Sequence, residues 1–424
     1  MKHAIHQVSR RTLLAGSLAS AVACRKKRAP QDRKLHLSFS VWGDDAELSA
    51  FTHIIRLFEQ LNPGIAIDLR QISYEERHQI ETLLAAGLGP DLFRVEYQEI
   101  GRYTPSGSLI DLSRYLPANL GDQFTPQSWA AVQHRGEPHA LPHHTDTSAV
   151  LYNKSLFAKL GIKVPQSLAE SWTWDQFIDV ANHLKRACPF AFAVNWTLGG
   201  SFRWLNFLYQ HGGSLTTDNG RQPAITSTAA LETLRWTQSF FQQNLVPASD
   251  SARSSEGVES LFANRVVGMY FDVGPQAMRE LRTGFEWSAT FLPRDRHFAS
   301  ELGGNAVGVS RDSKHPDLAA AFALFLTNEA NMRDFVTAAQ FLPVRRKLLT
   351  EHLHYTYRPD EMQVHLEQSK TVPVDLARTV TLPQFYKIER VLGEELDEAF
   401  VGGQSAEMTL ERIAAEMHRS LRPS

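Results

Sequence analysis

LHLSFSVWGDDAELSAFTHIIRLFEQLNPGIAIDL, residues 35–69, contains two strands and a helix in the order that defines an α/β fold. Apolar and polar side chains alternate over residues 35–41 and again over 65–69, as they do in half-buried strands. Between them, apolar residues recur at helical spacing until Asn62-Pro63-Gly64 ends the helix. Because such a strand–helix–strand unit places its two strands parallel, the segment predicts a parallel α/β sheet.

The ends of these strands carry the first candidate binding residues. In open α/β sheets, ligands bind beyond the carboxyl ends of the strands. The segment after the first strand and a short third strand after Gly87-Leu88-Gly89-Pro90 supply aromatic and acidic residues: Trp42, Asp44, Asp45, Asp91 and Phe93. We expect them to face a cleft, although helix capping or turn chemistry is an alternative for the three aspartates.

Composition limits the function classes. The 424 residues are 43% hydrophobic and 21% charged, so the chain can bury sizeable cores, and its length predicts two domains. A formal net charge of −2 argues against nucleic-acid binding, because no basic surplus exists to neutralise phosphates. The two cysteines are Cys24 and Cys188, so lipidation of the first would leave no intramolecular disulfide.

Residues 1–24 predict a signal peptide that ends in a lipobox. Basic residues, including Arg10-Arg11, precede an apolar run at 13–23 that is too short to cross a bilayer. The stretch 9–14 resembles a twin-arginine motif. Ala21-Val22-Ala23-Cys24 resembles a lipobox, so we expect diacylglycerol on Cys24, with an uncleaved anchor or a disordered tail as the alternative. Residues 25–34 predict a flexible tether.

Several stretches follow one another along the chain in a recurring order. In the first half these are FEQLNPGI (58–65), LAAGLGPDLF (84–93) and GSLIDLS (107–113). Farther along the chain they are LYNKSLF (151–157), LFANRVVGMYFD (261–272), ELGGNAVGV (301–309) and FLPVR (341–345). In this order they resemble the signatures of family 1 extracellular solute-binding proteins, which are the sugar-binding components of ABC importers and are similar to maltose-binding protein. The resemblance covers nearly the whole chain after the tether.

This resemblance implies a periplasmic-binding-protein-like fold of type II, with two doubly wound lobes joined by a hinge. The N-terminal lobe is expected at 35–143 plus 267–308, and the C-terminal lobe at 144–266 plus 309–424. The implied function is capture of a carbohydrate outside the cytoplasm by hinge closure, followed by delivery to the membrane subunits of an ABC importer. The protein is expected to be a periplasmic or cell-surface monomer without a cofactor, and not an enzyme.

Further candidate ligand contacts lie in and beyond the crossover between the lobes: His144, Asp146, Trp196, Trp204, Phe271, Asp272, Gly304 and Asn305. A pyranose has an apolar C–H face that packs on an aromatic ring, while its hydroxyl groups seek carboxylates and amides. Burial in the core is the alternative for both tryptophans, and a tight turn is the alternative for the glycine.

The pair His143-His144 also suggests a metal site, with His134 and His139 nearby. No zinc-ligand spacing is completed and thiolate ligands are missing, so we expect no metal. The same fold could instead hold a non-sugar solute; a glycerol phosphodiester would need an arginine cluster, whereas a polyamine would need carboxylates. A secreted glycoside hydrolase or lyase would need paired carboxylates, but the sequence has no nucleophile elbow, phosphate loop or HExxH motif.

Overall fold

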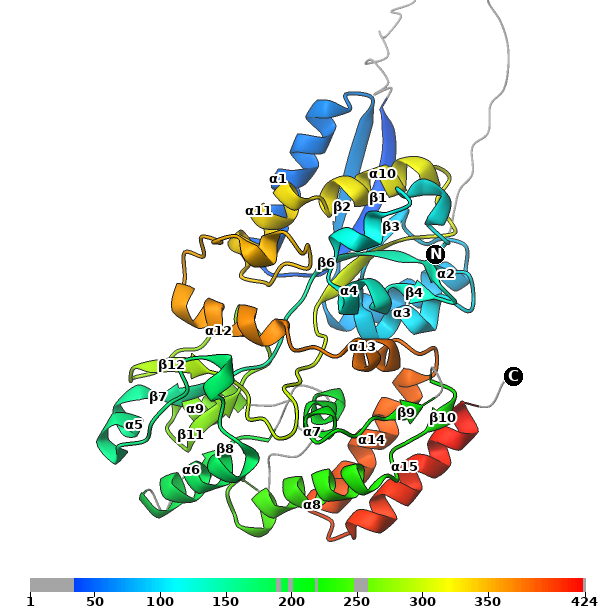
Figure 1. Cartoon of the computed structure of the whole chain (residues 1–424). Coiled ribbons are helices and arrows are strands. Elements are labelled where there is room, and N and C mark those ends of the chain that lie inside the picture. The colour runs from blue at the N-terminus through cyan, green and yellow to red at the C-terminus, as the bar shows by residue number, and fades with distance from the viewer. Residues whose placement is uncertain (1–33, 188–191, 197–200, 218–219, 248–257, 422–424) are drawn as a thin grey trace, which may run out of the picture.

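The computed structural model describes residues 34–187, 192–196, 201–217, 220–247 and 258–421. Cys24, Cys188 and the predicted signal segment 1–24 therefore lie outside the described residues. Figure 1 shows two halves, each built around its own sheet, with helices α12 (Pro359–Ser369) and α13 (Val374–Val380) between them. The predicted α/β class and two-lobed arrangement are confirmed.

The first sheet has five strands in the order β2-β1-β3-β13-β6. Strand β1 (Leu35–Val41) pairs in parallel with β2 (Ile65–Gln71) and with β3 (Leu92–Glu96), which confirms the predicted parallel unit. Strand β13 (Asn305–Val309) runs antiparallel between β3 and β6 (Ala140–His144). The carboxyl ends of β1 and β3 thus meet the amino end of β13 at one edge of the sheet.

Helices cover both faces of the first sheet. Phe51 of α1 (Asp45–Leu61), Phe322 of α10 (Pro316–Leu326) and Phe335 of α11 (Glu329–Ala339) belong to the core on one face, whereas Leu84 and Ile100 belong to the core on the other. The remaining elements of this half are η1 (Glu75–His78), α2 (Gln79–Ala85), α3 (Tyr97–Tyr103), η2 (Ser113–Tyr115), η3 (Leu120–Gln123), α4 (Pro126–Ala131), β4 (Gln133–His134), β5 (Glu137–Pro138), α10 (Pro316–Leu326), α11 (Glu329–Ala339) and η7 (Leu348–Thr350).

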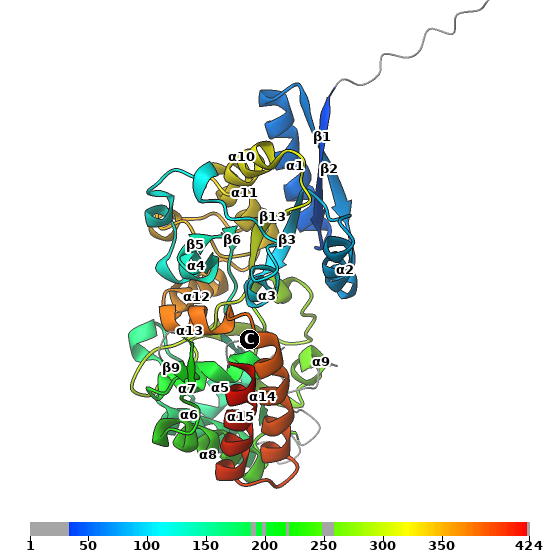
Figure 2. The same cartoon turned by 90° about the vertical axis from the view of Figure 1, so that its right-hand side faces the viewer.

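The second sheet has four strands in the order β12-β7-β11-β8. These are β12 (Trp287–Thr290), β7 (Val150–Asn153), β11 (Val267–Phe271) and β8 (Phe192–Val194). Around them lie α5 (Lys154–Leu160), η4 (Leu168–Glu170), α6 (Trp174–Ala187), η5 (Ser201–Trp204), α7 (Leu205–Gln210), β9 (Thr216–Thr217), β10 (Gln222–Pro223), α8 (Thr228–Gln242), α9 (Val258–Ala263), η6 (Pro275–Arg279), α14 (Phe385–Phe400) and α15 (Ala406–Ser420). In Figure 2, α14 and α15 lie side by side in this half.

Sheet membership corrects two of the expected lobe boundaries. Strand β11 was expected in the first lobe as part of 267–308, but it pairs with β7 and β8 in the second sheet. Helices α10 and α11 were expected in the second lobe, yet they pack on the first sheet. Local periodicity could not have predicted to which sheet these elements belong, because a strand or helix shows the same pattern on either sheet.

Two helices begin at capping boxes. The Asp44 side chain accepts hydrogen bonds from the backbone N–H groups of Ala46 and Glu47 at the start of α1, and Glu47 completes the capping box. Thr173 and Gln176 form the same reciprocal pair before α6. A capping box satisfies two backbone donors that the first helical turn leaves without partners.

The halves are joined by buried segments that cross between the sheets. The chain leaves β6 at His144 and enters β7 at Val150, and it returns after β12 through residues 291–304 to β13. Glu301 accepts hydrogen bonds from the Ser148 backbone N–H at 2.8 Å and from the Ser148 hydroxyl, so the two crossing segments are tied together. Across the described part of the chain, the helices are either too short or too polar to span a lipid bilayer.

Candidate functional site

A cleft of about 430 Å³ lies where the two halves face each other. The first half contributes the carboxyl ends of β1 and β3, and the second half contributes η5 and the segment after β11. The cleft is lined by Trp42, Glu47, Tyr74, Arg77, Arg94, Glu96, Gln98, Glu99, Asp146, Phe202, Arg203, Val273, Gln276, Gly303, Gly304, Asn305, Phe341 and Glu389. This is the position at which open α/β sheets bind ligands.

Aromatic rings line both sides of the cleft. Trp42 and Tyr74 from the first half meet edge to face with ring centroids 6.2 Å apart, and Phe202 comes from the second half. Tyr74 is 47% exposed, and the guanidinium of Arg77 lies over one face of its ring, 3.6 Å from the ring centroid, so the uncovered part of the ring is what a ligand can reach. Rings of this kind offer flat apolar surfaces on which the C–H face of a sugar can pack.

Hydrogen-bonding atoms without partners gather around the same cleft. Among the described residues, Asp146 Oδ1, Gln276 Oε1 and Asn305 Oδ1 are buried acceptors for which the protein provides no hydrogen bond, and Arg94 Nε is a buried donor in the same state. Buried polar atoms are normally satisfied, so each such atom needs an explanation. A ligand with several hydroxyl groups would satisfy these acceptors and could also accept from Arg94.

The arginines of the cleft are already engaged by the protein. Arg94 pairs with Glu47, and Arg77 pairs with Glu96 with its Nε 3.3 Å from Oε2. Arg203 donates from Nε to Glu301 Oε1 at 3.1 Å. These pairs hold the side chains in place and leave little free positive charge for a ligand.

Asp146 is the most unusual acid in the cleft. It is 7% exposed, and the cation beside it is Arg203, whose Nη2 lies 3.9 Å from Oδ1, beyond hydrogen-bonding distance. Burial raises the pKa of Asp146 to about 7, and the attraction of Arg203 opposes this rise only in part. A carboxyl group that is buried without a close partner favours its neutral form.

Two glycines allow the returning segment to approach Asp146. A Cβ atom on Gly303 would lie 1.9 Å from Asp146 Oδ1, and one on Gly304 would lie 2.6 Å from the carbonyl oxygen of His144. Gly304 also has a φ of +91°, which disfavours any residue with a side chain. Both glycines line the cleft, so the backbone itself forms part of its wall.

The structure brings some of the predicted site residues together. Trp42, Asp146, Gly304 and Asn305 all line the cleft. His144 lies just behind them: its Nε2 is 3.1 Å from Asn305 Nδ2 and 3.3 Å from Arg94 Nη2. His144 is therefore placed to orient two residues of the cleft wall.

Four predicted residues of the first half lie elsewhere. Asp44 and Asp45 form the start of α1, where Asp44 caps the helix and pairs with Arg279. Asp91 precedes the first residue of β3 and accepts hydrogen bonds from Ser38, so it lies at the amino end of the strand, opposite the cleft. Phe93 is buried in the core at 1% exposure.

Four predicted residues of the second half are also interior. Trp196 and Trp204 are each 1% exposed, and Trp204 Nε1 donates to Thr237 Oγ1 at 3.2 Å. Phe271 packs in the same core. Asp272 accepts from the Ala149 backbone N–H at 2.7 Å and lies 3.1 Å from His365 Nε2, so it supports the crossover rather than the cleft wall.

Several residues of the cleft were not predicted from the sequence, namely Tyr74, Arg77, Arg94, Glu96, Phe202, Gln276, Phe341 and Glu389. For one of them, Glu96, the sequence did contain a usable indication. Glu96 is the last residue of β3, so the carboxyl-end rule points to Glu96 rather than to Asp91. Phe341 and Glu389 come from segments far along the chain, and only the tertiary fold brings them to the cleft.

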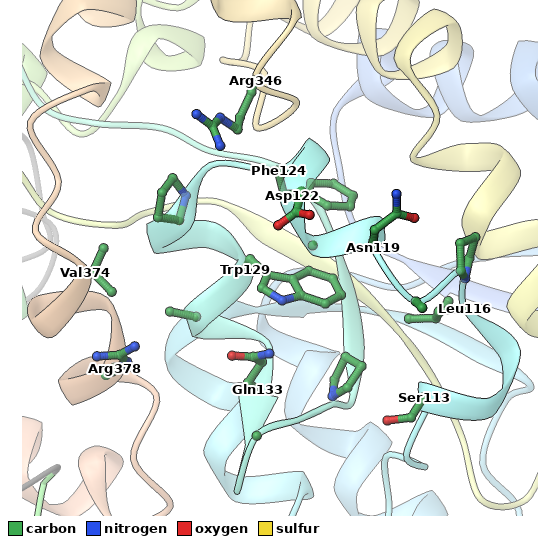
Figure 3. A pocket seen from close by; sticks show the side chains of 17 residues that line it. Ser113, Leu116, Asn119, Asp122, Phe124, Trp129, Gln133, Arg346, Val374 and Arg378 are labelled. Atoms are coloured by element: carbon green, nitrogen blue, oxygen red, sulfur yellow. The ribbon is translucent and has the colours of Figure 1, made fainter.

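A second hollow, of about 630 Å³, lies on the flank of the first half beside α4 and α13. Figure 3 shows Trp129 in its middle, with Arg346 and Arg378 at its edges. Trp129 stacks on Phe124 with ring centroids 5.7 Å apart. No residue that lines this hollow also lines the cleft, so the two are separate.

The histidine pair at the end of β6 is buried. His143 Nδ1 lies 2.9 Å from His144 Nδ1, and burial lowers the pKa of His143 to about 3, which keeps it neutral. Phe335 packs against both rings. Within the residues that the structure describes, no group of three or more histidine, cysteine or acidic side chains is arranged to hold a metal ion.

Fold and site together define a two-lobed α/β binding protein with a polar cleft between the lobes. The chain belongs to the bacterial extracellular solute-binding protein family, whose profile matches residues 42–333. A lipoprotein of Streptomyces antibioticus is 23% identical over 363 residues, which cover 82% of this chain and 79% of that one. The mannitol-binding protein of Pseudomonas aeruginosa is 25% identical over 403 residues, covering 86% and 89%.

Solved structures agree on the fold. The cyclic α-maltosyl-1,6-maltose binding protein of Arthrobacter globiformis superposes with a TM-score of 0.78 at 16% identity, covering 92% of this chain and 99% of that one. An ABC substrate-binding protein of Listeria monocytogenes in complex with cycloalternan has a TM-score of 0.76 at 20% identity, with the same coverage. At such identities the likeness establishes the type II two-lobed architecture and nothing about the ligand.

Proposed function

We propose that this protein binds a carbohydrate between its lobes and delivers it to an ABC importer in the membrane. The observation that carries the proposal is the set of buried acceptors without partners at Asp146, Gln276 and Asn305, next to the exposed ring of Tyr74. Hydroxyl groups are donors as well as acceptors, and the C–H face of a sugar packs on aromatic rings. A carbohydrate therefore matches both features of the cleft.

The named relatives support the same solute class. The chain is similar to a mannitol-binding protein and, at 22% identity over 318 residues, to the maltotriose-binding protein of Pyrococcus abyssi, of which the match spans 65%. The solved structures that share its fold include proteins bound to cycloalternan and to maltotetraose. A phosphodiester solute fits the cleft less well, because Arg77, Arg94 and Arg203 are already paired with carboxylates and are not free to bind a phosphate.

Capture proceeds by closure of the two lobes. A ligand that touches both lobes favours the closed state only by its differential affinity for closed over open. Tyr74 and Asn305 offer contacts from the first lobe, and Phe202 and Gln276 offer contacts from the second. The closed form then presents the solute to the importer's membrane subunits. This role requires binding and release without bond cleavage, so the protein is proposed not to be an enzyme.

The proposed site of action is outside the cytoplasm. Residues 1–24 supply an export signal of twin-arginine type, and Cys24 supplies a lipid anchor on a short tether. The likeness to a Streptomyces lipoprotein supports this anchor. The protein is proposed to act as a monomer at the membrane surface, in the periplasm or on the cell surface.

A thermal-shift screen tests the function. The purified chain from residue 34 onward is heated with mono- and oligosaccharides, with polyamines and with a glycerol phosphodiester. We expect a carbohydrate to raise the melting temperature by mass action, and the rise to be lost in Tyr74→Ala. Stabilisation by the phosphodiester or a polyamine alone would move the protein to another solute class, and turnover of a glycoside would contradict a binding-only role.

A further inference from the structure

The charges that line the cleft do not balance. Among its described lining residues, three are arginines and five are carboxylic acids: Arg77, Arg94 and Arg203 against Glu47, Glu96, Glu99, Asp146 and Glu389. The surplus is therefore negative. The partners of each carboxyl group show which of them carry this unpaired negative charge.

Three of the five acids are neutralised by the protein. Glu47 pairs with Arg94, and Glu96 pairs with Arg77 and accepts a hydrogen bond from the Tyr74 hydroxyl at 2.8 Å. Glu99 accepts from Arg102 Nη1 at 2.6 Å. Each of these carboxylates has a basic partner within hydrogen-bonding distance, so none of them needs a cation from a ligand.

Among the described residues, Asp146 has no such partner. Arg203 directs Nε to Glu301 and Nη2 to the carbonyl oxygen of Val273 at 3.3 Å, and it stays 3.9 Å from Asp146 Oδ1. Oδ1 is buried, receives no hydrogen bond from the part of the chain that the structure describes, and belongs to a side chain that lines the cavity. The charged and titratable groups that act on it are Arg203, Arg94, Glu301, Glu96 and Tyr97.

Glu389 of α14 faces the same cavity from the second half. Its carboxylate has no ion pair among the described residues, although the Phe202 backbone donates a hydrogen bond to it; burial, together with Glu99 and Glu96, raises its pKa to about 7. Among the described residues, two carboxyl groups thus reach the cleft from different elements without a cationic partner at hydrogen-bonding distance: Asp146, with Arg203 at 3.9 Å, and Glu389. A buried carboxylate without a partner is costly, and a cation brought by the ligand removes that cost.

We propose, resting on the carbohydrate-binding function above, that the solute is a basic carbohydrate whose protonated amino group pairs with Asp146. An ammonium group supplies donors for Oδ1 and the positive charge that the cleft lacks. The remaining hydroxyl groups of the sugar meet Gln276, Asn305 and Arg94. Glu389 lends a second negative charge, which discriminates against acidic sugars such as uronates.

Matched sets of sugars test this proposal by titration calorimetry with the wild-type chain near neutral pH. Each set contains an amino sugar, its N-acetyl derivative and the neutral hexose of the same configuration, as monosaccharides and as oligomers. In the set that binds best, the amino sugar should bind at least about tenfold more tightly than both analogues. Equal or tighter binding of the neutral or acetylated member would overturn the amine proposal and leave the carbohydrate function standing. Failure of every sugar in every set would contradict the function itself.

Two further measurements assign the effect to Asp146. The variant Asp146→Asn keeps the size of the side chain and should abolish the preference for the amine, whereas a preference that survives unchanged would overturn the proposal. In the wild type at about pH 6, where the amino group of the sugar is protonated before it binds, pairing with this ammonium group should expel a proton from Asp146, because the free carboxyl, with a pKa of about 7, is then mostly protonated. Calorimetry in two buffers of different ionisation enthalpy measures this release. Release with the amino sugar but not with the hexose supports the pairing, and no release in either case contradicts it. The proton measurement needs no variant, so a poorly folded Asp146→Asn does not weaken the test.

Discussion

Gly303 lies so close to Asp146 that a Cβ atom at position 303 would come within 1.9 Å of Asp146 Oδ1. The contact explains why the returning segment carries glycine where it meets the crossover. A substitution at position 303 can therefore displace the Asp146 carboxylate without changing the chemistry of that carboxylate.

Gly303→Ala should therefore weaken ligand binding by about tenfold or more, because the added methyl group forces Asp146 or the backbone to shift. Some loss of stability should accompany it, as overpacking typically costs about 1–3 kcal/mol. Gly284→Ala is the matched control, since a Cβ atom there meets nothing within 4 Å. Calorimetric affinities and melting temperatures check both variants. Unchanged affinity in Gly303→Ala would mean that Asp146 does not contact the solute.

Asp146 should lower the stability of the ligand-free protein as pH rises. Its folded pKa of about 7 lies above the ordinary value of 3.8, so the folded state binds more protons than the unfolded state between these values. Stability linked to this group is present at low pH and is lost as pH rises toward and beyond 7. Asp146→Asn should consequently gain stability relative to the wild type at about pH 8 compared with about pH 5. Urea unfolding at both pH values measures the difference, and a gain that is independent of pH would contradict this role of Asp146.

Asp44 should behave as a helix cap and not as a ligand contact. Asparagine caps helices as well as aspartate does, so Asp44→Asn should change the free energy of unfolding by less than about 0.5 kcal/mol, and Asp44→Ala should lower it by about 1 kcal/mol. Both variants should keep the wild-type affinity within about threefold, since Asp44 does not line the cleft and its pair with Arg279 is partly solvent-exposed. A large loss of affinity in Asp44→Asn would instead place this carboxylate in the binding site.

His365 should stabilise the crossover in its protonated form. Its Nδ1 lies 2.9 Å from the Thr147 carbonyl oxygen and its Nε2 lies 3.1 Å from Asp272, both of which can only accept. Although burial opposes the charged ring, Asp272 and the Thr147 carbonyl, together with Glu301, raise the pKa of His365 above 6.5. The stabilisation is thus complete below 6.5 and is lost as pH rises through the folded value.

The variant His365→Gln should accordingly cost more stability at about pH 6 than at about pH 9. The exposed His418→Gln on α15 serves as the control and should show no comparable dependence. Chemical unfolding of the three proteins at both pH values gives the answer. A cost that grows with pH would show that the neutral ring is the stabilising form.

Much of the fold could be predicted from local patterns. The alternation in 35–41 and 65–69, with the helix and its Asn62-Pro63-Gly64 stop, defined β1, α1 and β2 within a residue or two. The capping alternative at Asp44 was visible because a capping box joins residues only three apart. The lobe boundaries at 267 and 309 were wrong in detail, because the sheet on which β11 or α10 packs is decided by contacts distant in sequence.

The candidate site was predicted less completely, for physical reasons that differ between residues. Trp42 directly follows β1 and lines the cleft, whereas Asp91 lies at the amino end of β3, where the carboxyl-end rule does not apply. Trp196 and Trp204 have the kind of ring on which sugars pack, but large apolar side chains suit the core equally well. The structure places both of them in the core. No local sequence pattern predicts that Arg203 or Glu389 lines the cleft. Both residues reach it only because η5 and α14 face the first lobe in the folded protein.

Titration calorimetry of one carbohydrate ligand from the thermal-shift screen, into the wild type and two variants, tests the central claim most directly. Tyr74→Ala removes an exposed ring of the cleft, and Trp204→Phe alters a buried ring of the second lobe. We predict that Tyr74→Ala weakens binding by about tenfold or more with little change in melting temperature, while Trp204→Phe lowers the melting temperature and leaves the affinity within about threefold. The reverse pattern, with affinity lost in Trp204→Phe and kept in Tyr74→Ala, would contradict capture of a carbohydrate in this cleft.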